Sequence, residues 1–89
     1  MVLGGHKEWI KRIKTLLPNV KFLGDRTPTR EALKHVDTIF FQTRAGISHP
    51  MFYCSIDMAK NLDIPILYFT SSGVYKCAEQ IVIYDKNQS

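Results

Sequence analysis

The apolar residues of the chain form short continuous runs that alternate with longer stretches at helical spacing. Runs typical of β-strands occupy residues 1–3, 20–24, 36–43 and 65–70. Between and after these runs, apolar residues recur every three or four positions, which predicts helices over residues 6–17, 28–35, 49–62 and from 74 onward. Residues 81–84 fit either an extension of the last helix or a further strand.

Local signals mark the ends of these elements. Pro18 ends the first helix. Thr27 is the predicted N-cap of the second helix, with Pro28 at its first helical position. Ser48 or His49 caps the third helix.

Strands that alternate with helices of this length predict an α/β fold with a parallel sheet covered on both faces. We expect a small Rossmann-like three-layer sandwich with four parallel strands in the order 2-1-3-4. The run 36–43 is dense in β-branched and aromatic residues, so it should be central. Residues 1–84 form one domain in this interpretation, and residues 85–89 form a C-terminal tail.

Composition narrows the class of protein further. The chain has 89 residues, 45% hydrophobic and 22% charged, which is typical of a globular domain. No apolar run is long enough to span a membrane, and the first residues do not resemble a secretory signal, so we expect a cytoplasmic protein without a membrane partner. The net charge of +4 favours anionic partners.

The cysteine pattern predicts no metal site. Cys54 and Cys77 are far apart in a chain without an export signal, so both are expected to be reduced thiols, either packed or on a helix surface. A zinc site needs more ligands at closer spacing. We expect no metal and no cofactor.

Four turns should meet at the carboxyl edge of the sheet, where ligands bind in such folds. They span residues 4–6, 24–27, 42–49 and 70–73. The candidate ligand-binding residues in these turns are Gly4, Gly5, His6, Thr43, Arg44, Ser48, His49, Ser71, Ser72 and Gly73.

The chemistry of these turns favours an anion. Helices begin there with unpaired backbone N–H groups, Gly46 and the other glycines permit close backbone approach, and Arg44 suits a phosphate or carboxylate. Neither a G-x-G-x-x-G fingerprint nor a Walker A loop is present, so ordinary NAD or ATP binding is not supported. Plainer roles remain open: the glycines as tight turns, the serines as helix caps, and Arg44 as a surface residue.

His6 and His49 have three possible roles: orienting a ligand, a purely structural role, or acid–base catalysis on a phosphoester. The turns lack the paired carboxylates of metal-dependent phosphate hydrolysis, and Ser48 lacks the G-x-S-x-G elbow of a nucleophile. The sequence therefore leans against an enzyme.

Several motifs carry a resemblance to a known family. They are GGH after the first strand, ALKHVDTIFFQT leading to ISH, and AKNLDIPILYFTSSGV, and together they cover roughly residues 3–78. In these motifs the chain resembles a group of small bacterial and phage domains of unknown function with a Rossmann-like fold. The resemblance implies the fold and a candidate site at His6 and Ser48-His49, but no activity. The small size resembles phage or mobile-element accessory proteins, including anti-defence proteins.

Three functions follow as hypotheses. The first is a small protein that senses or sequesters a phosphate-bearing ligand, such as a nucleotide, a cyclic oligonucleotide or an ADP-ribose derivative. The second is a nucleic-acid-binding regulator that uses Lys7, Lys11, Arg12 and Lys14 of the first helix. The third is a protein-interaction module or an inhibitor of a host protein, and a homodimer is compatible with all three.

Overall fold

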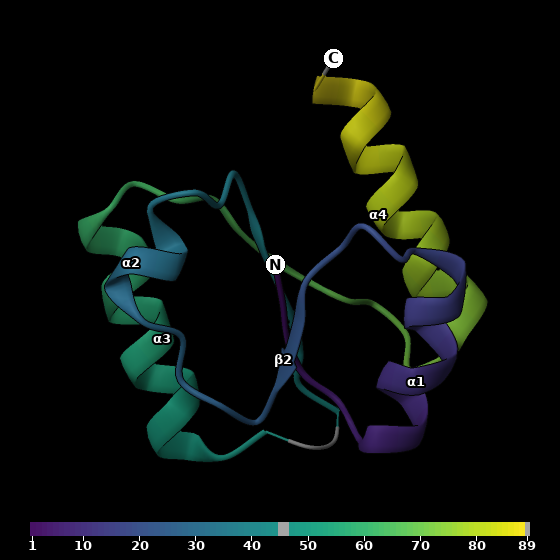
Figure 1. The fold of residues 1–89 in the computed structure, drawn as a ribbon, viewed down its shortest axis with the longest axis horizontal. Coiled ribbons are helices and arrows are strands. Elements are labelled where there is room, and N and C mark those ends of the chain that lie inside the picture. The colour runs from purple at the N-terminus through teal and green to yellow at the C-terminus, as the bar shows by residue number, and fades with distance from the viewer. Residues whose placement is uncertain (45–46, 89) are drawn as a thin grey trace.

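A computed structural model describes residues 1–44 and 47–88, and this part of the chain alternates strands with helices (Figure 1). The elements are β1 (Val2–Gly4), α1 (Lys7–Leu16), β2 (Phe22–Gly24), α2 (Arg30–Leu33), β3 (Ile39–Gln42), α3 (His49–Asn61), β4 (Ile66–Tyr68) and α4 (Val74–Gln88).

The four strands form one parallel sheet in the order β2-β1-β3-β4, which confirms the predicted fold class and strand order. The strand run 36–43 contributes β3, which lies between β1 and β4 as expected for a central strand. In the register of β1 and β3, Gly4 lies opposite Gln42. The order of the strands reverses between β1 and β3, so the crevice that binds ligands in open α/β sheets is expected at their carboxyl ends.

Helices cover both faces of the sheet. α1 and α4 lie on one side and α2 and α3 on the other (Figure 1). Alternate residues of β3 divide between two cores: Phe40 packs with Ile13 of α1 and Ile81 of α4, whereas Phe41 packs with Met51 of α3. The two-residue period of a strand thus supplies both halves of the hydrophobic core.

The cap of α2 differs from the sequence prediction. Thr29, not Thr27, is the N-cap, and its hydroxyl accepts a hydrogen bond from Ala32 N–H at 3.1 Å. Pro28 therefore precedes the cap instead of starting the helix. Both Pro28 and Leu33 are buried, and these are the two positions of a hydrophobic staple, so burial of the proline ring explains the shift.

The last helix is longer than the sequence alone could establish. Residues 81–84 continue α4, and the helix runs to Gln88, so residues 85–88 of the expected tail are helical. Ser89 lies outside the described residues, as do Ala45 and Gly46.

A glutamine of α4 covers part of the open edge of β4. The Gln80 side-chain amide donates to Tyr68 O at 3.0 Å, and its oxygen accepts from Thr70 N–H at 3.3 Å. The side chain thus pairs with backbone groups that would otherwise be available to another strand.

Candidate functional site

A hollow of about 350 Å³ lies at the carboxyl edge of the sheet, between the first turn of α1, the end of β3 and the start of α4. We call it the rim hollow. Five of the candidate residues from the sequence line it: Gly5, His6, Arg44, Ser72 and Gly73. Its remaining lining residues are Glu8, Trp9, Arg12, Gln42 and Val74.

Gln42 joins the elements around the rim hollow. Its side chain is only 2% exposed, and its amide nitrogen donates to Ser71 O at 3.1 Å and to the Cys77 sulfur at 3.6 Å. Its amide oxygen accepts from Arg44 N–H at 3.3 Å. Both ends of the amide are therefore used, and they connect β3 to the loop before α4 and to α4 itself. Sequence reasoning missed Gln42, because a glutamine at the end of a strand carries no signal of its distant partners.

Positive charge reaches the rim hollow from two elements. Arg12 projects from α1, and Arg44 follows β3, where its guanidinium donates to Thr70 O at 3.4 Å. The starts of α1 and α4 add backbone N–H groups and the positive dipole end of each helix. Glu8, in the first turn of α1, brings a negative charge to the same hollow.

Trp9 forms an aromatic wall of the rim hollow. Its ring packs edge-on against Phe22 and Phe69, with centroids 6.3 and 5.7 Å apart. A Cβ on Gly5 would lie 2.5 Å from the indole ring, and Gly5 has a φ of 97°, so only glycine fits comfortably beside it. The indole Nε1 is buried and has no partner at hydrogen-bond geometry within the described residues.

Three other candidate residues line a separate hollow of about 210 Å³ at the same edge, which we call the aromatic hollow. They are Thr43, Ser48 and His49, and they share it with Ile47, Phe52 and Tyr53. The His49 and Tyr53 rings stack with centroids 6.2 Å apart. His6 and His49 thus line different hollows, and this arrangement does not form the acid–base pair considered for a phosphoester.

The start of α3 already faces a carboxylate of the protein. Ser48 N–H donates to Asp25 Oδ1 at 2.7 Å, and the Ser48 side chain makes no capping hydrogen bond. An anion at this helix end would be repelled by Asp25. The rim hollow is therefore the better anion site of the two.

Gly4 and Ser71 lie next to the rim hollow in the chain but do not line it. Gly4 is buried, and Ser71 Oγ accepts from Gly73 N–H at 3.0 Å, which shapes the turn before α4. Gly46, which the sequence suggested for close backbone approach, lies outside the described residues.

The basic residues of the first helix are exposed and lie on two stripes of its surface. Lys7, Lys11 and Lys14 follow one another at i, i+4 and i+7, so they share one stripe of α1. Arg12 lies on a neighbouring stripe and faces the rim hollow. Of the four basic residues proposed to bind nucleic acid, only Arg12 also lines the rim hollow.

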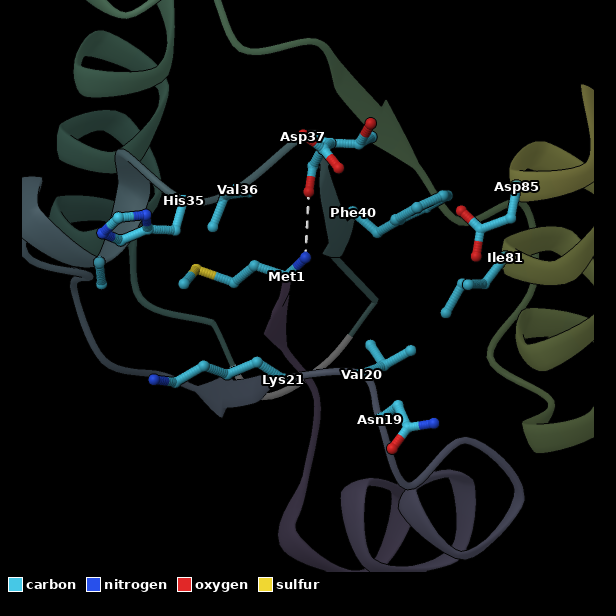
Figure 2. A pocket seen from close by; sticks show the side chains of 12 residues that line it. Met1, Asn19, Val20, Lys21, His35, Val36, Asp37, Phe40, Ile81 and Asp85 are labelled. Carbon is cyan, nitrogen blue, oxygen red and sulfur yellow. Dashed lines mark hydrogen bonds between the residues drawn. The ribbon is translucent and has the colours of Figure 1, made fainter. Parts of the chain in front are cut away.

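Another hollow, of about 460 Å³, lies at the opposite, amino edge of the sheet (Figure 2). Met1 crosses its centre and its amino group donates to Thr38 O at 3.0 Å. Burial lowers the pKa of this amino group, and the nearby carboxylates of Asp85 and Asp37 counter that effect. Its lining pairs the carboxylates of Asp37 and Asp85 with Lys21 and the Met1 amino group, so these charges balance, whereas two arginines face one carboxylate in the rim hollow.

No group of three or more histidine, cysteine, aspartate or glutamate side chains is placed to hold a metal ion in residues 1–44 and 47–88. In the same residues, no helix has the length and apolar character needed to cross a membrane.

The two cysteines lie in contrasting environments. Both are free thiols, as expected: Cys54 is exposed on α3, and Cys77 is fully buried on α4. Burial raises the pKa of the Cys77 thiol, and the hydrogen bond from the Gln42 amide partly offsets this. The folded protein thus holds the Cys77 proton more tightly than the unfolded chain does. The stability from this difference is present below the unfolded pKa and is lost as the pH rises through the folded pKa.

We expect iodoacetamide at pH 8 to alkylate Cys54 quickly and to spare Cys77 in the folded protein, because the thiolate is the reactive form and Cys77 is inaccessible. Peptide mass spectrometry before and after denaturation in urea measures this, and both cysteines should react in urea. Equal labelling of both residues under native conditions would contradict the buried position of Cys77.

Fold and site define this chain as a small Rossmann-like α/β domain with a basic hollow at the carboxyl edge of its sheet. Comparisons with models of known families, with curated proteins and with solved structures each returned no match. The resemblance to small bacterial and phage domains therefore stays a prediction from the sequence motifs.

Proposed function

We propose that this protein binds a small phosphate-bearing ligand, such as a nucleotide, in the rim hollow and thereby senses or sequesters it. One observation carries the proposal: Arg12, Arg44 and the starts of α1 and α4 meet around a single hollow. Arginines and helix N-termini are the groups that proteins commonly use to hold phosphates.

The size of the rim hollow bears on the choice among ligands. Its volume of about 350 Å³ is at the lower end of the roughly 300–1,000 Å³ typical of small-molecule sites. A nucleotide fits this volume better than a cyclic oligonucleotide, and an ADP-ribose derivative would extend beyond it. We therefore take a nucleoside phosphate as the leading ligand class.

The proposal predicts that Arg44→Gln weakens binding of a nucleoside phosphate by about 10- to 100-fold, because a charge-assisted hydrogen bond to phosphate contributes about 1.5–3 kcal/mol. Calorimetric titration with a panel of nucleotides measures the effect. The matched control is Lys14→Gln, which removes the same charge from a residue that lines none of the hollows described here. It should change the affinity less than about threefold, as expected for a screened surface charge.

Two outcomes would contradict the proposal. The first is that no nucleotide in the panel binds to the purified protein or raises its melting temperature. The second is that Arg44→Gln and Lys14→Gln weaken binding equally. Equal losses, together with tight binding to oligonucleotides that falls steeply with salt, would favour the alternative of a nucleic-acid-binding regulator that uses the lysine stripe of α1.

Self-association, interaction with a host protein and a cytoplasmic location stay proposals of the sequence alone. The outer side of α4 offers apolar residues that a protein contact could use, since Val82 is 39% and Ile83 50% exposed. Neither residue lines the rim hollow, so a protein contact there is compatible with ligand binding.

A further inference from the structure

A second hollow lies next to the rim hollow, between α1 and α4. This second hollow, which we call the helix hollow, has a volume of about 220 Å³. Arg12 and Val74 line both hollows, so the two share a wall. Thr15, Leu16 and Tyr75 complete the lining of the helix hollow. A ligand in the rim hollow that reached past Arg12 would enter the helix hollow.

The chemistry changes along this path. The rim end has two arginines and two helix starts, whereas the helix hollow has the apolar side chains of Leu16 and Val74 and the ring of Tyr75. Tyr75 is 72% exposed, and Leu16 is 42% exposed. The described lining of the helix hollow contains no carboxylate. The path thus runs from an end with two arginines and two helix starts to an aromatic end, where Arg12 is the charged side chain of the described lining.

We propose that the ligand carries a nucleobase, which stacks on the Tyr75 ring in the helix hollow while its phosphate lies in the rim hollow. This inference rests on the proposed function, because it extends the same site. Arg12 stands at the junction and can contact the phosphate or cover the face of the base. The Thr15 hydroxyl donates to Lys11 O at 3.0 Å, so its oxygen keeps acceptor capacity for a base N–H group.

The dimensions of the path suit one nucleotide. Nine residues separate His6 at the rim from Thr15 in the helix hollow, a rise of about 13 Å along α1. A protein partner is a poorer occupant, because a stable interface buries about 800 Å² on each side and Leu16 and Tyr75 supply only a fraction of this. The change from positive to aromatic lining matches the polarity of a nucleoside phosphate.

The test uses Trp9, the single tryptophan of the chain, as a reporter because it lines the rim hollow. Quenching of its fluorescence gives the affinity for inorganic phosphate, for ribose 5-phosphate and for each of the four nucleoside 5′-monophosphates. We expect at least one nucleoside monophosphate to bind about 10-fold or more tighter than ribose 5-phosphate, since base stacking on an aromatic side chain is favourable for every base.

The variant Tyr75→Ala should remove this difference and leave the affinity for ribose 5-phosphate unchanged. Tyr75→Phe should retain it, because the ring is kept. The matched control is Tyr53→Ala, which deletes another exposed tyrosine from the aromatic hollow and should alter neither affinity.

The outcomes separate this inference from the proposed function. If ribose 5-phosphate binds as tightly as every nucleoside monophosphate, or if Tyr75→Ala weakens both ligands equally, base stacking on Tyr75 is wrong and phosphate binding stands. If none of these phosphates binds, both proposals are wrong.

Discussion

The variant Gln42→Leu is expected to lower the free energy of unfolding by about 2–3 kcal/mol, since a buried donor or acceptor that loses its partner costs about 1–3 kcal/mol. The Gln42 side chain is 2% exposed, and leucine can neither donate to Ser71 O nor accept from Arg44 N–H. Leucine also branches where glutamine is linear, which adds a packing cost. Urea denaturation, followed by Trp9 fluorescence and circular dichroism, measures the change.

The same variant should also weaken ligand binding under conditions where it stays folded. Gln42 positions Arg44 through the backbone and holds the loop before α4 through Ser71. Without these bonds, both sides of the rim hollow lose a fixed position, and pre-organisation contributes directly to affinity. We expect a loss of affinity for nucleoside phosphates comparable to that of Arg44→Gln, measured by the same titration.

Gln80→Leu is the matched control for stability. Gln80 also pairs its amide with two backbone groups, Tyr68 O and Thr70 N–H, but these groups lie at the exposed edge of β4. Water can replace the lost amide there, so the cost should stay below about 1 kcal/mol. If the two glutamine variants were equally destabilised, the buried connection through Gln42 would not be what organises the rim hollow.

The fold was predictable because its signals are local or periodic. The apolar run at residues 36–43 marks the central strand, and its alternate residues Phe40 and Phe41 supply the two cores. The cap of α2 was predicted wrongly, because Thr27 and Thr29 both flank Pro28 and only burial of the proline distinguishes them. The extension of α4 through residues 81–84 depended on packing of Ile81 and Tyr84 against the core, which a run of apolar residues does not reveal.

The site was predictable only in part, for a geometric reason. The topology places all carboxyl-end turns at one edge, so Gly5, Arg44 and Ser72 do meet. The topology does not determine which hollow at that edge each side chain lines. His49, for example, lines the aromatic hollow instead of the rim hollow. The hydrogen bond from Ser48 N–H to Asp25 joins residues 23 positions apart, and no pattern in the sequence predicts it.

The variant Gly4→Ala is expected to be the most damaging single change described here. Gly4 has a φ of 85°, a left-handed conformation that costs other residues about 1–2 kcal/mol. A Cβ at this position would also overlap the carbonyl oxygen of Gln42, the residue opposite Gly4 in the register of β1 and β3. Backbone cannot rotate away as a side chain can, so the two central strands must separate, at a further cost of about 1–3 kcal/mol.

The total of about 2–5 kcal/mol is a large share of the roughly 4–13 kcal/mol that stabilises a domain of this length. Thermal unfolding followed by circular dichroism should show a melting temperature lower by about 8–40 °C, since 1 kcal/mol corresponds to about 4–8 °C in a small domain. In the extreme case, the variant would already be unfolded at 25 °C and would show no cooperative transition.

Two further glycines make this test discriminating even if Gly4→Ala does not fold. Gly24 also has a positive φ, 66°, but its added Cβ would lie 3.2 Å from the end of the Ile10 side chain, which can move, so Gly24→Ala should cost about 1–2 kcal/mol. A Cβ on Gly73 would meet Ser71 Oγ at 3.4 Å, an ordinary contact, so Gly73→Ala should change stability by less than about 0.5 kcal/mol. This ranking arises because a backbone obstacle adds to the conformational cost only at Gly4. A Gly4→Ala protein as stable as Gly73→Ala would mean that β1 and β3 do not approach each other closely at the site of the rim hollow.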